Sequence, residues 1–258
     1  DLAGTVVACG PAVTAFEPGD RVCALIGHVG GAQSDLVLLR QGRAARIPDA
    51  VPFVPAAALP LAGLTALQGL HRAGRLRARS SGRARVLVLG ASGGIGAFAV
   101  QLARLAGAAV TASTTGRTLD FVRSLGPDAV LDRDREAPLR PGDGWDLVFD
   151  TPGRLRLRDV EPSLAPHGVL VSTRGVSPDA VRSLARGRRG PEFASVRTAA
   201  RPADLDLLLR LVAEDRLRVP VHRVLPMAQA AEAHRDAEQG AEGKVVIELL
   251  PGSAPDPA

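Results

Sequence analysis

Tyrosine is absent from the chain, and aromatic residues of all kinds make up only 3% of it. The core must therefore be built mainly from alanine, valine and leucine. Mechanisms that use a tyrosine hydroxyl as the acid, such as the Tyr/Lys pair of short-chain dehydrogenases, are excluded.

Cysteine is almost as scarce, with only Cys9 and Cys23 in 258 residues. Two thiols cannot form a tetrathiolate zinc site, and they do not make the disulfide framework of a secreted protein. A reducing, cytoplasmic location is the expectation. No signal-peptide pattern opens the chain, and no run approaches the roughly 18 to 20 apolar residues of a membrane span, so no membrane partner is expected.

Lysine occurs once, as Lys244, although the net charge is +5 and the isoelectric point is near 10.6. The arginines are scattered through every segment rather than gathered into a patch, which argues against nucleic acid as a partner. The basic run Ala185 to Gly190 is interpreted as a solvated loop.

The first 61 residues have the texture of a β-rich unit. TVVACG, RVCALIG and SDLVLL read as short strands, and EPGD (residues 17–20) is a turn between the first two. Because the chain already reads as a strand from Asp1, we expect a preceding segment to be missing.

Strand and helix patterns alternate in residues 62–199, beginning with the helical LAGLTALQGLHRAG and the buried strand RARVLVLG. The helix that follows places Ile95, Phe98, Leu102 and Leu105 on one face. This alternation predicts an α/β fold with a doubly wound parallel sheet.

After residue 199 the pattern returns to amphipathic helices and short strands, ending in KVVIELL. We therefore predict one domain from residues 1–61 and 200–250, interrupted by an α/β domain at 62–199, with a disordered tail at 251–258.

A glycine-rich turn follows the buried strand in VLVLGASGGIGAFAVQLA. It matches A-x-G-x-x-G at Ala91, Gly93 and Gly96, between a strand and a helix, as a dinucleotide-binding fingerprint requires. Gly93 would let the backbone approach a pyrophosphate, and Gly96 would let the helix pack on the strand. The alternative reading is a structural turn without a ligand.

The next strand ends in ASTTGRT, without the acidic residue that usually holds the ribose 2′-hydroxyl of NAD. Thr115 and Arg117 offer a hydroxyl and a guanidinium instead, which suit a 2′-phosphate. The pattern predicts NADPH as the cofactor, unless Arg117 is an ordinary surface arginine.

These motifs, together with LPLAGLTALQGL, FVRSLGPDAVLD and AAEAHRDAEQGAEGKVVIEL, resemble the medium-chain dehydrogenase/reductase superfamily. The resemblance spans nearly all of residues 1–250 and is strongest to the zinc-independent NADPH:quinone oxidoreductase group. It implies a Rossmann domain inserted in a GroES-like catalytic domain whose N-terminal part is absent here. It also implies a homodimer formed through the edge strand FASVRT.

The resemblance also implies which further residues contact the cofactor. Thr115 and Arg117 match the positions that select NADPH. Arg133, after Asp132, stands where the family often has tyrosine, and the segment from Gly31 to Leu36 lacks its usual aromatic residue. The other contacts carried over are Ser92, Gly94 and Ile95 at the pyrophosphate, Thr65 near the nicotinamide, and Ser172 to Gly175 and Lys244 along the cofactor cleft.

No zinc site and no catalytic residue can be assigned from the sequence. Cys23 and His28 lack a third ligand at suitable spacing, and the five histidines lie in loop-like or amphipathic contexts. The expected chemistry is hydride transfer from NADPH to a quinone or an α,β-unsaturated carbonyl, whose product is protonated by water or a modest acid. Two alternatives remain: a non-catalytic NADPH-binding homologue, and an enoyl reductase dedicated to one biosynthetic pathway.

Overall fold

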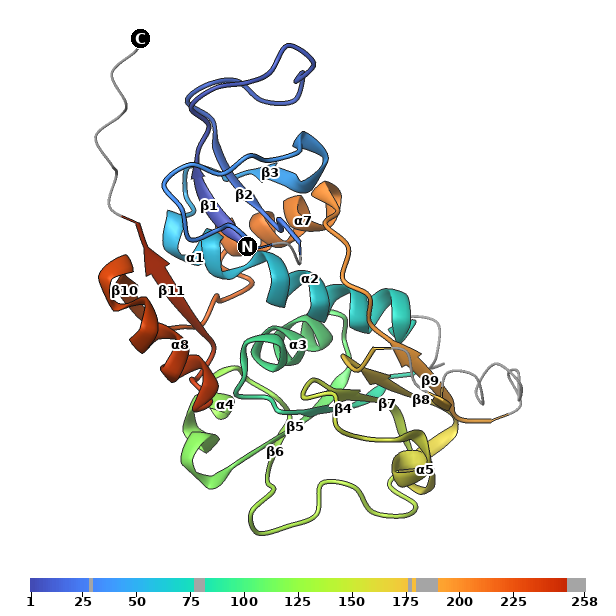
Figure 1. Cartoon of the computed structure of the whole chain (residues 1–258). Coiled ribbons are helices and arrows are strands. Elements are labelled where there is room, and N and C mark those ends of the chain that lie inside the picture. The colour runs from blue at the N-terminus through green and yellow to red at the C-terminus, as the bar shows by residue number, and fades with distance from the viewer. Residues whose placement is uncertain (28–29, 77–81, 176–177, 180–189, 250–258) are drawn as a thin grey trace. The chain divides into compact units, whose positions relative to one another are not determined.

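The computed structural model describes residues 1–27, 30–76, 82–175, 178–179 and 190–249 (Figure 1). Its contacts divide the chain into two units, Thr65–Thr198 and the combination of Asp1–Leu64 with Ala199–Ala258. The first boundary falls inside helix α2 (Pro60–Gln68). The basic run predicted as a loop at 185–190 falls, except for Gly190, outside the described residues, and so do His28 and the predicted tail.

The unit Thr65–Thr198 contains a parallel sheet of six strands in the order β6-β5-β4-β7-β8-β9. Strand β4, the first of these strands in the sequence, lies in the middle of the sheet. Strands β5 and β6 extend the sheet on one side and β7 to β9 on the other, which is the strand order of a Rossmann fold. The predicted fold class is thereby confirmed. The strands are β4 (Arg85–Leu89), β5 (Ala109–Thr114), β6 (Ala129–Asp132), β7 (Trp145–Asp150), β8 (Leu164–Ser172) and β9 (Glu192–Ser195).

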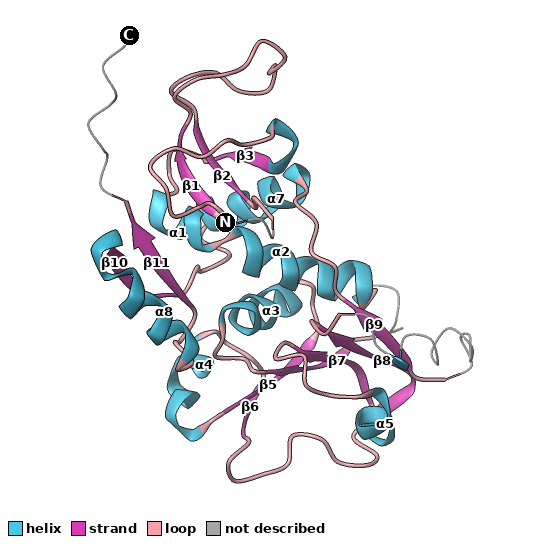
Figure 2. Ribbon diagram, viewed as in Figure 1, coloured by secondary structure: helices cyan, strands magenta, loops and turns pink. Residues whose placement is uncertain are grey.

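Central strands of this sheet are buried on both faces, because helices cover them (Figure 2). Helix α3 (Gly94–Leu105) packs on β4 and β5, and α4 (Leu119–Ser124) packs on β5 and β6. A short helix, α5 (Leu157–Val160), contacts β8.

The predicted apolar face of α3 is only partly buried. Phe98 is fully buried and Leu102 is 3% exposed, as expected for a face that packs on the sheet. Leu105, however, is the last residue of the helix and is 41% exposed. The i, i+3, i+4 spacing predicts which side chains share a face, but it does not predict where the covering strands end.

The unit built from both chain ends holds two small sheets. Strands β1 (Leu2–Thr5), β2 (Arg21–Ala24) and β3 (Ala44–Arg46) form an antiparallel sheet in that order, and β10 (Val221–Pro226) pairs with β11 (Lys244–Glu248) in parallel. The helices of this unit include α1 (Phe53–Ala58), α7 (Pro202–Ala213) and α8 (Ala230–Glu238).

Two strand predictions in this unit are wrong. Strand β1 ends at Thr5, where the predicted strand TVVACG begins, and residues 34–39 form no strand at all. Leu36 and Leu38 in the second segment are 60% and 101% exposed. An apolar run forms a strand only when a neighbouring strand satisfies its backbone, and within the described residues none pairs with this segment.

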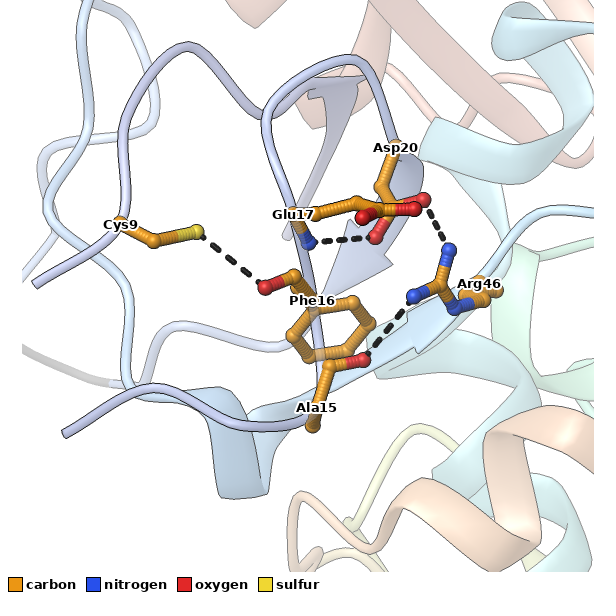
Figure 3. A network of polar contacts seen from close by, with 6 residues as sticks. All are labelled: Cys9, Ala15, Phe16, Glu17, Asp20 and Arg46. Atoms are coloured by element: carbon orange, nitrogen blue, oxygen red, sulfur yellow. Dashed lines mark hydrogen bonds and ion pairs between the residues drawn. The ribbon is translucent and has the colours of Figure 1, made fainter. Parts of the chain in front are cut away.

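A polar network holds the loop between β1 and β2, shown in Figure 3. The Arg46 guanidinium forms an ion pair with Asp20 and donates to the Ala15 carbonyl at 3.1 Å. The second carboxylate oxygen of Asp20 accepts the Glu17 N–H at 2.7 Å. The Asp20 N–H in turn donates to the Glu17 carbonyl at 3.1 Å, which closes the predicted EPGD turn.

Helix α2 continues into a π-helical turn, Gly69–Ala73. The predicted helix at residues 61–74 is thus helical along almost its whole length, but its last turn is wider than an α-helix. A Cβ on Gly69 would overlap the ring of Phe149 on β7, so the close approach of this helix to the sheet requires a residue without a side chain. Among the described residues, no helix is long and apolar enough to cross a membrane.

Candidate functional site

The carboxyl ends of the parallel strands form one edge of the six-stranded sheet. In a doubly wound sheet, ligands bind at this edge where the strand order reverses. Here the order reverses between β4 and β7, because β5 and β6 extend the sheet on one side and β8 and β9 on the other. The predicted cofactor residues between 92 and 172 follow or end these strands, so the topology gathers them at this edge.

The glycine turn after β4 has a tightly constrained backbone. Gly90 has a φ of +71°, and a Cβ there would lie 2.8 Å from the Thr151 hydroxyl oxygen. The Thr151 hydroxyl donates to the Leu89 carbonyl at 2.7 Å. A Cβ on Gly96 would overlap the Gly90 carbonyl and lie 2.7 Å from the Ala91 Cα. Helix α3 therefore approaches the turn closely only because position 96 has no side chain.

Gly93 differs from these two glycines because a side chain there would meet little protein. A Cβ on Gly93 would contact only the Gly90 carbonyl oxygen, at 3.5 Å, and its backbone angles (φ −76°, ψ 168°) suit any residue. The fold itself does not require glycine at this position. Close approach of a ligand would require it, so the turn fits the predicted contact with a pyrophosphate.

The N-terminus of α3 adds hydrogen-bond donors beside this turn. Gly93 caps the helix without a side-chain hydrogen bond, and the first helical bond runs from the Ala97 N–H to the Gly93 carbonyl. The N–H groups of Gly94, Ile95 and Gly96 precede that bond and thus have no partner within the helix. No acidic residue lies in the first turn. Backbone donors and the positive end of a helix dipole suit a phosphate anion.

The end of β5 carries the residues predicted to hold a 2′-phosphate. Thr115 follows the strand, and its hydroxyl lies 3.4 Å from that of Thr118, which lies 2.5 Å from the Thr114 hydroxyl. Thr114 and Thr118 are buried, whereas Arg117 is exposed. The hydroxyl pair fixes the short 3-10 turn Gly116–Thr118, and the Arg117 side chain extends from that turn.

The neighbouring loop after β6 adds two carboxylates to this region. The Asp134 carboxylate accepts the Gly116 N–H at 3.1 Å, and the Asp132 carboxylate accepts the Asp134 N–H at 3.0 Å. Arg133, predicted to contact a phosphate, is exposed between them, and its N–H donates to the Thr114 carbonyl at 2.9 Å. The structure thus brings Thr115, Arg117 and Arg133 together, but with acidic neighbours that the sequence motif did not single out.

Asp150, at the end of β7, is a buried carboxylate that sequence reasoning missed. It is 1% exposed, and one oxygen accepts the Leu155 N–H at 2.8 Å and the Ser172 hydroxyl at 3.2 Å. The Ser172 oxygen accepts the Arg174 N–H at 3.1 Å. This chain of bonds fixes the loops after β7 and β8. The only sequence signal was an acidic residue closing the apolar strand DLVFD.

Ser172, predicted to line a cofactor cleft, is fully buried, and its hydroxyl is engaged by Asp150. Thr65, predicted to lie near the nicotinamide, is 4% exposed, and its hydroxyl lies 2.7 Å from that of Thr198. Both hydroxyl groups therefore already form hydrogen bonds with other residues of the unit Thr65–Thr198.

Lys244 belongs to the other unit, at the start of β11. Burial lowers the pKa of its ammonium group, because a charged group is less well solvated there than in water. Its N–H donates to the Pro220 carbonyl at 2.9 Å. The predicted contact of Lys244 with the cofactor stays a prediction.

The metal-ligating residue types are dispersed over the residues that the structure describes. In those ranges no three histidine, cysteine, aspartate or glutamate side chains lie together as a metal site would require. Cys23 is fully buried, and burial raises the pKa of its thiol to about 12, so it is a poor source of a thiolate ligand.

The sheet order and the glycine turn at its reversal define an α/β protein of the Rossmann class. Comparison with known proteins narrows this class. Residues 125–247 match a family described as zinc-binding dehydrogenase. The chain is 33% identical to the chloroplast envelope quinone oxidoreductase homolog of Arabidopsis thaliana, over 96% of this chain and 78% of the relative.

Solved structures also show similarity to quinone oxidoreductases. The Escherichia coli quinone oxidoreductase complexed with NADPH superposes with a TM-score of 0.78 and 25% identity, over 95% of this chain and 80% of that one. The CurF ER cyclopropanase of curacin A biosynthesis superposes with a TM-score of 0.81 and 25% identity, over 96% and 77%. The chain belongs to the medium-chain dehydrogenase/reductase superfamily, in its quinone oxidoreductase-like branch, and is an oxidoreductase.

Proposed function

We propose that this chain is an NADPH-dependent reductase that transfers a hydride to a quinone or an α,β-unsaturated carbonyl without zinc. The observation that carries the proposal is the turn at Gly93, where the backbone is open to a ligand beside the free donors of α3. Relatives named as quinone oxidoreductases, one of them solved with NADPH, support the same cofactor and acceptor class.

In this proposal the protein binds and orients the cofactor. The N–H groups of Gly94, Ile95 and Gly96 hold the pyrophosphate, and Arg117 with Thr115 binds the 2′-phosphate. Ser92 lies in the glycine turn directly before Gly93 and is proposed as a further contact of the pyrophosphate. Bound NADPH supplies the hydride. Thr65 and Arg133, which belong to the same unit as the glycine turn, are proposed as further contacts, and the contact of Lys244 stays a prediction.

The acceptor class follows from what the described residues offer. Reduction of a simple ketone needs a group that polarises the carbonyl, whereas quinones and enones are already electrophilic and mainly need orientation. The chain has no tyrosine to act as that acid, and no zinc ligand set is proposed. Protonation of the product by water or a modest acid completes the reaction.

The test combines binding with turnover. NADPH affinity of the purified chain is measured by calorimetry, and NADPH oxidation is followed across a panel of quinones and enones. Gly93→Ala should weaken NADPH binding at least about tenfold while leaving the melting temperature unchanged, because its Cβ occupies ligand space rather than protein space. Gly42→Ala is the matched control, since a Cβ there meets nothing within 4 Å and no cofactor contact is predicted at that position.

Failure of NADPH to bind would overturn the proposal. Tight binding without oxidation by any acceptor would favour the alternative of a non-catalytic homologue. Turnover of a single enone, with quinones inert, would favour a pathway-specific reductase, a second candidate supported by the similarity to the CurF enzyme of curacin A biosynthesis. Formation of a homodimer through β9 and a cytoplasmic location also stay predictions.

A further inference from the structure

The loops after β5 and β6 combine groups that attract a phosphate with groups that repel it. Thr115 and Arg117 flank Gly116. The Gly116 N–H donates a hydrogen bond to the Asp134 carboxylate at 3.1 Å. A backbone N–H at the end of this strand is a donor that a 2′-phosphate could use. In this chain a carboxylate already accepts it.

Asp134 is held in this position by its own loop. The Asp132 carboxylate accepts the Asp134 N–H at 3.0 Å, and the Arg135 and Glu136 N–H groups donate to the Asp132 carbonyl at 3.0 and 2.9 Å. A Cβ on Gly116 would lie 3.2 Å from the Asp132 carboxylate. Two carboxylates therefore lie against the backbone of Gly116.

Neighbouring arginines do not neutralise Asp134. Arg135, the residue after Asp134, forms its ion pair with Asp132 at 3.6 Å. In the part of the chain that the structure describes, no ion pair involves Asp134, and the residue is exposed. Its carboxylate thus lies beside Gly116, between Thr115 and Arg117, with no ion-pair partner among the described residues.

We infer that Asp134 is a specificity-determining residue that limits the preference for NADPH over NADH. The inference rests on the proposed function. NADPH differs from NADH by a 2′-phosphate with a charge near −2, so the Asp134 carboxylate repels NADPH and leaves NADH almost unaffected. Arg117 favours the phosphate and Asp134 opposes it, which makes the chain less selective than its arginines alone would predict.

The test measures dissociation constants of NADPH and NADH for the purified chain by calorimetry. Asp134→Asn removes the charge but keeps an oxygen that can accept the Gly116 N–H. We expect NADPH affinity to rise about three- to tenfold at low salt, NADH affinity to change less than about twofold, and the gain to shrink at 0.5 M salt, because salt screens exposed charges.

Two further variants separate charge from structure. Asp134→Ala removes both the charge and the hydrogen bond, and it should shift the NADPH/NADH ratio in the same direction as Asp134→Asn. Asp159→Asn, on α5, removes one exposed carboxylate charge at another part of the same unit and should leave the ratio unchanged.

The outcomes are distinguishable. If both cofactors bind and Asp134→Asn leaves their ratio at the wild-type value, the inference is wrong and the proposed function stands. If only Asp134→Ala shifts the ratio, the hydrogen bond rather than the charge is responsible, and the inference is also wrong. If neither cofactor binds the wild-type chain, the proposed function and the inference fall together.

Discussion

The glycine turn after β4 and the pair of loops after β5 and β6 occupy the same edge of the sheet but are built differently. The turn is specified by backbone shape: Gly90 needs a positive φ, and Gly96 must lack a side chain. The loops are specified by side-chain charge, with Arg117 and Arg133 set beside Asp132 and Asp134. The residues of the turn can be substituted only at the expense of its backbone conformation, whereas charged residues on exposed loops can be substituted with little effect on the fold. We therefore expect the turn to determine whether a dinucleotide binds and the loops to determine which one.

Gly96→Ala should have the largest effect, because it acts on the backbone-built region. Its Cβ would overlap the Gly90 carbonyl, so α3 must move away from the turn. We expect unfolding by urea to show a loss of about 3 kcal/mol of stability, together with loss of NADPH binding. Gly42→Ala again serves as the control. A variant with wild-type stability would contradict the close packing of α3 on the turn.

Arg117→Ala should have an intermediate effect that appears only with one cofactor. Loss of a charged donor to the 2′-phosphate should weaken NADPH binding about tenfold and leave NADH binding unchanged. The melting temperature should not move, since the side chain is exposed. Calorimetric titration with both cofactors measures this, with Arg158→Ala on α5 as the control. Equal weakening of both cofactors would show that Arg117 does not read the 2′ position.

Asp128→Asn should have the smallest effect, because this carboxylate lies at the opposite end of β5 from the cofactor loops. Asp128 accepts the Val110 N–H at 2.8 Å and the Arg83 guanidinium at 2.6 Å, and the hydrogen bond from the Val110 N–H, followed by that from Arg83, holds its pKa below the usual value. A lowered folded-state pKa stabilises the fold above the unfolded-state pKa, near 3.9. That contribution is lost as pH falls through the folded-state value.

Thermal melts of Asp128→Asn and wild type should therefore differ slightly and constantly from pH 8 to about pH 5, with the variant less stable. The difference should shrink below about pH 4, as the wild-type carboxyl becomes protonated. Cofactor affinities should not change in the variant. A melting difference that persists undiminished at pH 2 would mean that packing, rather than charge, explains the effect.

Much of the Rossmann unit could be predicted from the sequence because its strands are short, continuous apolar runs bounded by turns. RVLVL and WDLVFD need no information about their neighbours to be recognised as buried strands. SDLVLL was predicted wrongly although it also contains a continuous apolar run, LVLL. A strand also needs a partner strand, and Leu38 is fully exposed instead.

The residues of the candidate site also divide into those that a local sequence pattern predicts and those that depend on distant neighbours. Gly93 and Gly96 could be predicted as site residues from the sequence because the motif that contains them is local. Asp134 and Asp150 were missed because their partners lie 18 and 22 residues away along the chain, at Gly116 and Ser172. Only the sheet order brings those residues together. Charge at a ligand site depends on neighbours of this kind, which is why a nicotinamide cofactor is easier to predict from the sequence than a preference between NADPH and NADH.

The buried thiol of Cys23 has a consequence for the chemical durability of the protein. With a pKa of about 12, only about one thiol in 10⁵ is ionised at pH 7. Electrophiles such as quinones and enones react with thiolates far faster than with thiols. With the proposed acceptors, burial of the Cys23 sulfur and its protonation would protect this thiol from modification by the substrate.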